Sequence, residues 1–195
     1  MDYKSVIGTI GIILTFVGYA PYVRDVLKRK TTPHLFTWLI WSLAAGISAA
    51  LQIFGGAGAG AWSTVAVTFI SVYILFLSFR QGNRDFTYLD MSCLVLALLS
   101  LFLWVVVKQP VWSAFLIVTA DILGFIPTMR KSWAKPYSET LSAYWMAGVR
   151  HALSITALRQ FNILTMLYPV VLVIANTVSI FILTTRRKAI PEHHA

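Results

Sequence analysis

Long apolar runs separated by short polar segments make up almost the whole chain. Each run is about 20 residues long, which is the length that an α-helix needs to cross roughly 30 Å of hydrocarbon. The pattern predicts seven transmembrane helices, near residues 5–23, 34–54, 61–79, 87–107, 111–129, 140–158 and 162–185. We therefore expect an all-α integral membrane protein, and we expect it in a bacterial inner membrane.

The lysine and arginine residues are distributed unevenly between the segments that separate these runs. Twelve of them follow the first, third, fifth and seventh runs, whereas Lys4, Lys108 and Arg159 fall on the opposite side. Because cytoplasmic loops carry an excess of basic residues, this predicts a cytoplasmic C-terminus, an external N-terminus and an odd number of crossings. Topology thus explains the net charge of +9. We expect membrane lipid and a small solute as partners, and no nucleic acid.

One motif occurs twice in the chain. The segment Gly18-Tyr19-Ala20-Pro21-Tyr22-Val23-Arg24 is matched 106 residues later by Gly124-Phe125-Ile126-Pro127-Thr128-Met129-Arg130. A repeated motif indicates a repeated structural unit. A proline inside a helix removes a backbone donor and weakens the helix locally, so Pro21 and Pro127 are predicted to be paired hinges.

The same offset aligns the first three predicted helices with the last three. Two units of three crossings can be parallel only if a further crossing lies between them, and the run 87–107 supplies it. The predicted organisation is a first triple-helix repeat at 1–80, a linker helix within 81–110, and a second triple-helix repeat with a basic tail at 111–195. Paired units of this kind form one known transporter design, in which the solute is held between the halves.

The seventh run carries the most specific likeness to a known family. Its segment Tyr168-Pro169-Val170-Val171-Leu172-Val173-Ile174-Ala175-Asn176-Thr177-Val178, followed by Arg186-Arg187, resembles the last helix of a SemiSWEET repeat. The chain as a whole resembles the PQ-loop superfamily and its SWEET and SemiSWEET branch. The resemblance implies that Asn176 contacts the solute and that Pro21 and Pro127 act as hinges, although Tyr22 and Thr128 stand where the family has glutamine.

Polar residues inside the predicted spans are the other candidates for a site. Burying an ionised side chain at mid-membrane costs about 2.5–3.5 kcal/mol on insertion scales, so Asp121 and Arg150 should face a cavity or each other. They either bind a charged solute or form a structural ion pair. His151 is either a hydrogen-bonded structural residue or a proton carrier. Ser71 lies on a hydroxyl stripe that bonds neighbouring helices or contacts solute.

Tryptophan residues have two interpretations as well. A tryptophan ring can pack against a flat or sugar-like solute, or it can lie in the aromatic belt at the membrane interface. We predict the pocket for Trp41 and Trp145, and the belt for Trp38 and Trp62.

These features together predict a transporter that moves a small polar solute, such as a sugar or a similar metabolite, by alternating access. The alternatives are a receptor or sorting protein on the same scaffold, like the KDEL receptors, and a proton-coupled carrier of an amino acid, nucleoside or organic acid. No motif of a hydrolase, nucleotide-binding enzyme or zinc protease occurs in the sequence. We therefore expect no enzymatic activity, no cofactor and no metal.

Overall fold

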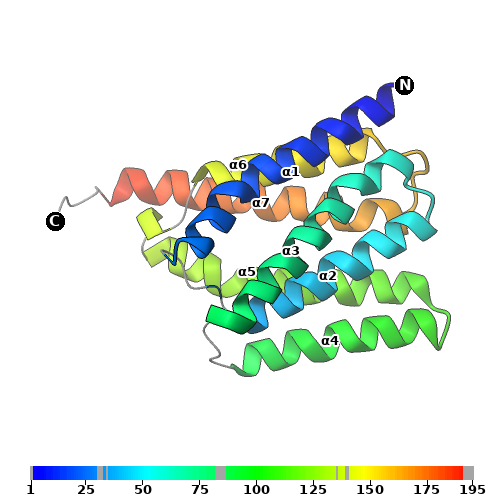
Figure 1. Cartoon of the computed structure of the whole chain (residues 1–195), viewed down its shortest axis with the longest axis horizontal. Helices are drawn as coiled ribbons and strands as arrows, with labels where there is room; N and C mark the ends of the chain where they lie inside the picture. The colour runs from blue at the N-terminus through cyan, green and yellow to red at the C-terminus, as the bar shows by residue number, and fades with distance from the viewer. Residues whose placement is uncertain are drawn as a thin grey trace.

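Helices account for nearly all of the described residues in a computed structural model of the protein (Figure 1). The structure describes residues 2–29, 33, 35–81, 87–134, 136–138 and 141–190, and these residues include no β-strand. The elements are α1 (Tyr3–Leu27), α2 (Leu35–Phe54), η1 (Gly58–Ala61), α3 (Trp62–Gln81), α4 (Tyr88–Val105), α5 (Pro110–Ala134), η2 (Pro136–Ser138), α6 (Leu141–Thr156) and α7 (Ile163–Ala189).

Within the described part of the chain, five helices are long and apolar enough to cross a membrane: α1, α2, α3 together with η1, α4 and α7. They coincide with five of the seven predicted spans. The described apolar part of α5 ends at Phe125, and α6 has 16 residues, about 24 Å of helix. Crossing by α5 and α6 therefore stays a prediction, as does the orientation of the chain. Lys30, Arg84 and Lys135, which contributed to that orientation, lie outside the described residues.

Large apolar side chains cover the outside of the helices. Phe69, Phe181 and Trp112 are each more than 60% exposed. Contiguous apolar surface of this kind is rare on proteins that live in water. Surrounding lipid removes the cost of exposing it, so the surface fits a membrane-embedded protein.

The helices pack in the same order in two sets of three. Helix α3 packs on both α1 and α2, and α7 packs on both α5 and α6. The sets meet along two lines, α1 against α6 and α2 against α5. Exchanging α1 with α5, α2 with α6 and α3 with α7 turns one of these lines into the other. The contacts therefore have the pattern of a pseudo-twofold arrangement.

Helix α4 lies at the edge of the bundle, beside α5 and α2 (Figure 1). A capping box starts it, because Thr87 and Asp90 bond each other's backbone N–H groups. Its serine Ser100 bonds the carbonyl and hydroxyl of Ser113 on α5, at 2.9 and 2.8 Å. The link between α4 and α5 is only four residues long, which fits an antiparallel helix pair.

The two lines of contact between the sets are filled differently. Where α2 meets α5 and α7, Ile47, Leu51, Ile117, Tyr168 and Leu172 form the largest apolar cluster. Where α1 meets α6, the facing residues are smaller or polar, including Thr15 and Gly18. Apolar side chains therefore close one side of the interface, and the other side has room for a cavity.

Close packing between α1 and η1 depends on a missing side chain at Gly8. A Cβ atom added there would lie 2.8 Å from the carbonyl oxygen of Ala59 and 2.9 Å from the ring of Trp62. At Gly46 on α2, the nearest atom would be the Thr68 methyl at 3.5 Å, an ordinary contact.

We predict that Gly8→Ala lowers the free energy of unfolding by about 1–3 kcal/mol, because overpacking forces the backbones apart. The matched control Gly46→Ala should be as stable as the unmodified protein or slightly more stable, since alanine favours helix. Thermal unfolding of the purified proteins in detergent measures both. Equal melting temperatures for the two variants would contradict the prediction.

Candidate functional site

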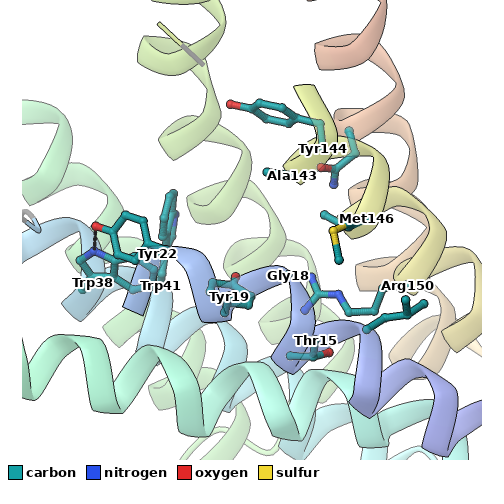
Figure 2. Close-up of a pocket in the computed structure, with 13 residues that line it drawn as sticks. Thr15, Gly18, Tyr19, Tyr22, Trp38, Trp41, Ala143, Tyr144, Met146 and Arg150 are labelled. Atoms are coloured by element: carbon teal, nitrogen blue, oxygen red, sulfur yellow. Dashed lines mark hydrogen bonds between the residues drawn. The ribbon is translucent and has the colours of Figure 1, made fainter. Parts of the chain in front are cut away.

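A cavity of about 330 Å³ lies between the two sets of helices (Figure 2). This volume is at the small end of the range for small-molecule sites. Helices α1, α2, α6 and α7 supply its lining residues: Leu14, Thr15, Gly18, Tyr19, Tyr22, Trp38, Trp41, Ala143, Tyr144, Met146, Ala147, Arg150 and Asn176. Residues from both sets therefore form its walls.

One end of the cavity is aromatic. The indole N–H of Trp38 donates a hydrogen bond to the hydroxyl of Tyr22 at 3.1 Å (Figure 2). The rings of Trp38 and Trp41 meet edge to face with centroids 5.2 Å apart, and Tyr19 meets Trp38 at 6.4 Å. Such pairs stabilise one another beyond the area that they bury. This end therefore offers rigid ring surface.

The other end is cationic. The Arg150 side chain extends from α6 toward Gly18 and Thr15 of α1 (Figure 2) and is only 5% exposed. Its Nη2 lies 3.0 Å from Nε2 of His151. No described residue bonds its Nε or Nη1, or the Nδ1 of His151. Buried polar groups normally have partners, so these unpaired donors make this end of the cavity a candidate binding site.

A second hollow of about 110 Å³ adjoins the first and shares Tyr19, Trp41, Ala147, Arg150 and Asn176 with it. It adds Ser71, Asp121, His151 and Tyr168 to the polar surface. Asp121 is 5% exposed and faces the Tyr168 hydroxyl. Among the described residues no ion pair joins Asp121 to Arg150, so the two do not form the structural pair that was one of the predicted alternatives.

Six of the seven predicted solute-binding residues meet in these two hollows: Trp41, Ser71, Asp121, Arg150, His151 and Asn176. Asn176 is 2% exposed, and its side-chain amide N–H donates to the carbonyl of Leu172 at 2.7 Å. The family resemblance singled out Asn176, and the structure places it in both hollows. Its contact with a solute stays a prediction.

Trp145 does not line either hollow and is 54% exposed on the outside of α6. Ala143, Ala147 and Arg150 recur at helical spacing on the cavity side, and Trp145 is on the opposite side of the same helix. Trp38 was predicted to lie in the aromatic belt at the membrane interface. It is only 4% exposed and lines the cavity, so it is not a belt residue.

Sequence reasoning also missed Tyr19 and Tyr22 as part of the site. Both belong to the motif around Pro21, which was interpreted only as a hinge. Pro21 lies inside α1 and Pro127 lies within the range of α5, but the side chain of Pro127 is outside the described residues. The sequence did contain a sign of this role, because an aromatic residue follows the glycine in both copies of the motif. These residues are Tyr19 and Phe125, and each lines a hollow.

Packed backbone closes the site on the face that carries the N-terminus. There the link between α2 and α3 meets the link between α6 and α7 (Figure 1). The backbone N–H of Arg159 donates to the carbonyl of Ala57 at 3.0 Å, and the Asn162 side chain donates to the carbonyl of Gly55 at 2.8 Å. Leu158 packs on Ala57 in a small apolar cluster. The main cavity lies on the opposite side, where α1 ends and α2 and α6 begin.

Charged side chains at the start of α1 reinforce this closed face. Lys4 donates to the carbonyl of Leu158 at 2.8 Å, and Arg159 pairs with Asp2 at 3.2 Å. Hydrogen bonds from Ser5, and then the nearby Arg159, hold the pKa of the Asp2 carboxyl below its usual value. The carboxylate is therefore charged at neutral pH and can keep its partner.

Comparisons of the chain with protein-family models, with curated proteins and with solved structures each found no match. The helix arrangement and the chemistry of the two hollows are therefore the features that indicate a function.

We predict that Arg150→Met raises the free energy of unfolding by about 1–3 kcal/mol when no solute is added, because it removes buried donors that have no partner. Chemical or thermal unfolding in detergent measures the change. The control Arg159→Met removes an exposed arginine, and its effect should stay below about 1 kcal/mol. A clear loss of stability for Arg150→Met would show that the guanidinium is a structural element.

Proposed function

We propose that this protein is a membrane transporter that moves a small polar solute by alternating access. In this proposal α1–α3 and α5–α7 are two triple-helix units, α4 links them, and all seven helices cross the membrane. This is the organisation that the resemblance to the SWEET and SemiSWEET branch implies. The observation that carries the proposal is a cavity between the two sets that holds the unpaired Arg150 and lies opposite the face closed by packed backbone.

The packing order of the helices supports two equivalent units. In each set the third helix packs between the first and the second, and the contacts between the sets exchange under the same pairing. Parallel three-helix repeats with a solute site at their interface are a known transporter arrangement. Partly unpaired polar groups at such an interface favour a ligand site, and the two equivalent units favour a transporter over a receptor.

The closed face supports alternating access, because its contacts are the kind that can separate. They consist of a few hydrogen bonds, a small apolar cluster around Leu158 and one exposed ion pair, Arg159 with Asp2, and an exposed pair contributes little free energy. In the proposed cycle these contacts break while the units rock about Pro21 and Pro127. The solute then reaches the face that carries the N-terminus, and the opposite face closes.

Asn176 is the residue on which the solute site can be tested most directly. We predict that Asn176→Ala reduces uptake into proteoliposomes at least about tenfold, the effect of losing roughly 1.4 kcal/mol of binding. The assay uses a panel of radiolabelled sugars, nucleosides, amino acids and organic acids. The neighbouring Thr177→Ala, on the exposed side of α7, is the matched control and should transport normally. Unchanged uptake by Asn176→Ala would remove this residue from the site.

A disulfide across the closed face should stop the cycle. The hydrogen bond between the backbones of Ala57 and Arg159 brings them within reach of a disulfide. The chain has one cysteine, so Cys93→Ala provides a background without native thiols. We predict that the pair Ala57→Cys and Arg159→Cys loses uptake on oxidation and regains it on reduction. Full uptake by protein shown to be cross-linked would contradict alternating access.

A further inference from the structure

Among the residues that the structure describes, the main cavity is lined by a basic residue, Arg150, and by no acidic residue. Arg150 is the only lysine or arginine among the residues that line either hollow, and two of its three nitrogen atoms have no partner in the described part of the chain. Asp121 is the only acidic lining residue, and it faces Tyr168 without pairing with Arg150. A buried cation of this kind lacks the anion that normally accompanies it.

Hydroxyl groups of a neutral sugar would not compensate such a group well. A hydroxyl can accept a hydrogen bond from the guanidinium but does not neutralise its charge, whereas a carboxylate supplies the opposite charge and two oxygen atoms that match the planar arginine fork. A solute that carries a carboxylate would therefore gain most of its binding at Arg150. The same cation would penalise a solute with a positive charge at that point.

The opposite end of the cavity is aromatic and favours an apolar part of a solute. Tyr22 and Trp38 satisfy each other by hydrogen bonding, so this end presents ring faces and edges. Trp41 and Tyr19 extend the same surface toward the cation. Ring surface of this kind binds flat or apolar groups. The cavity therefore has a cationic end for a head group and an aromatic end for a body.

We propose that the solute is a small organic anion, whose carboxylate binds Arg150 while its apolar body packs on Tyr19, Tyr22, Trp38 and Trp41. This inference rests on the proposed function, since it names the class of solute for the same cavity. Asn176 lines the wall between the two ends and can bond a polar substituent.

Binding to the detergent-purified protein tests the inference without requiring transport. The probes are carboxylate and amide pairs of equal shape, benzoate with benzamide, 3-phenylpropionate with its amide, and hexanoate with hexanamide. Thermal shift and titration calorimetry measure each pair. We expect at least one carboxylate to bind with a Kd about tenfold or more below that of its amide. Equal affinities within every pair, or no binding by any carboxylate, would overturn the inference.

Variants of Arg150 test whether this residue causes the preference for a carboxylate over its amide. Arg150→Gln should remove the difference between carboxylate and amide, and Arg150→Lys should retain part of it, because a lysine keeps the charge without the planar fork. The control Arg159→Gln, on the closed face, should keep the full difference. A preference that persists in Arg150→Gln would show that the anion binds elsewhere.

Uptake into proteoliposomes separates this inference from the proposed function. Carboxylate-selective binding without uptake of any solute would leave the anion site intact and refute the transporter. Uptake of a neutral sugar, with no competition from the carboxylates, would support the transporter and refute the anion site.

Discussion

A buried and largely unpaired positive charge is the main constraint on this structure. Arg150 lies in the second half of α6 and is almost wholly buried, yet most of its donors have no protein partner. A packed helix can carry such a residue only if the residue faces a polar space. That requirement fixes which side of α6 faces α1, places His151 beside the guanidinium, and puts the exposed Trp145 on the outer side. It also explains why the interface between the two sets of helices is not filled with apolar side chains along its whole length.

The two lines of contact between the sets of helices differ in the side chains that form them. Along α2 and α5, aliphatic side chains and Tyr168 hold the sets together. Along α1 and α6, small residues and polar groups leave the cavity open. A single continuous core would be more stable, but it would leave no room for a solute. An interface that is apolar on one side and hollow on the other joins the two sets without filling the space between α1 and α6.

Much of this arrangement could be predicted from the sequence, because hydrophobic length and charge cost are local properties. Five spans follow from run length alone. The cost of burying polar groups singled out Asp121, Arg150 and His151, the family resemblance singled out Asn176, and Ser71 and Trp41 came from helical spacing and residue type. The incorrect predictions concern the side of a helix on which a residue lies. Trp145 and Trp38 were assigned by residue type and by distance from basic loops, whereas the side of the helix on which each lies depends on its neighbours. Likewise, only the contacts across helices reveal that Asp121 and Arg150 remain apart.

From Gly56 to Ala61 the link between α2 and α3 alternates glycine with alanine, so it presents main chain and methyl groups to the closed face. Gly56 and Gly58 have positive φ angles of 81° and 60°, which only glycine adopts without strain. The neighbouring link therefore packs directly on the backbone, and a Cβ atom added to Gly60 would lie 2.5 Å from a side-chain carbon of Leu158. A larger side chain at Gly60 would push the two links apart, so the closure of this face depends on a residue that does not line the cavity.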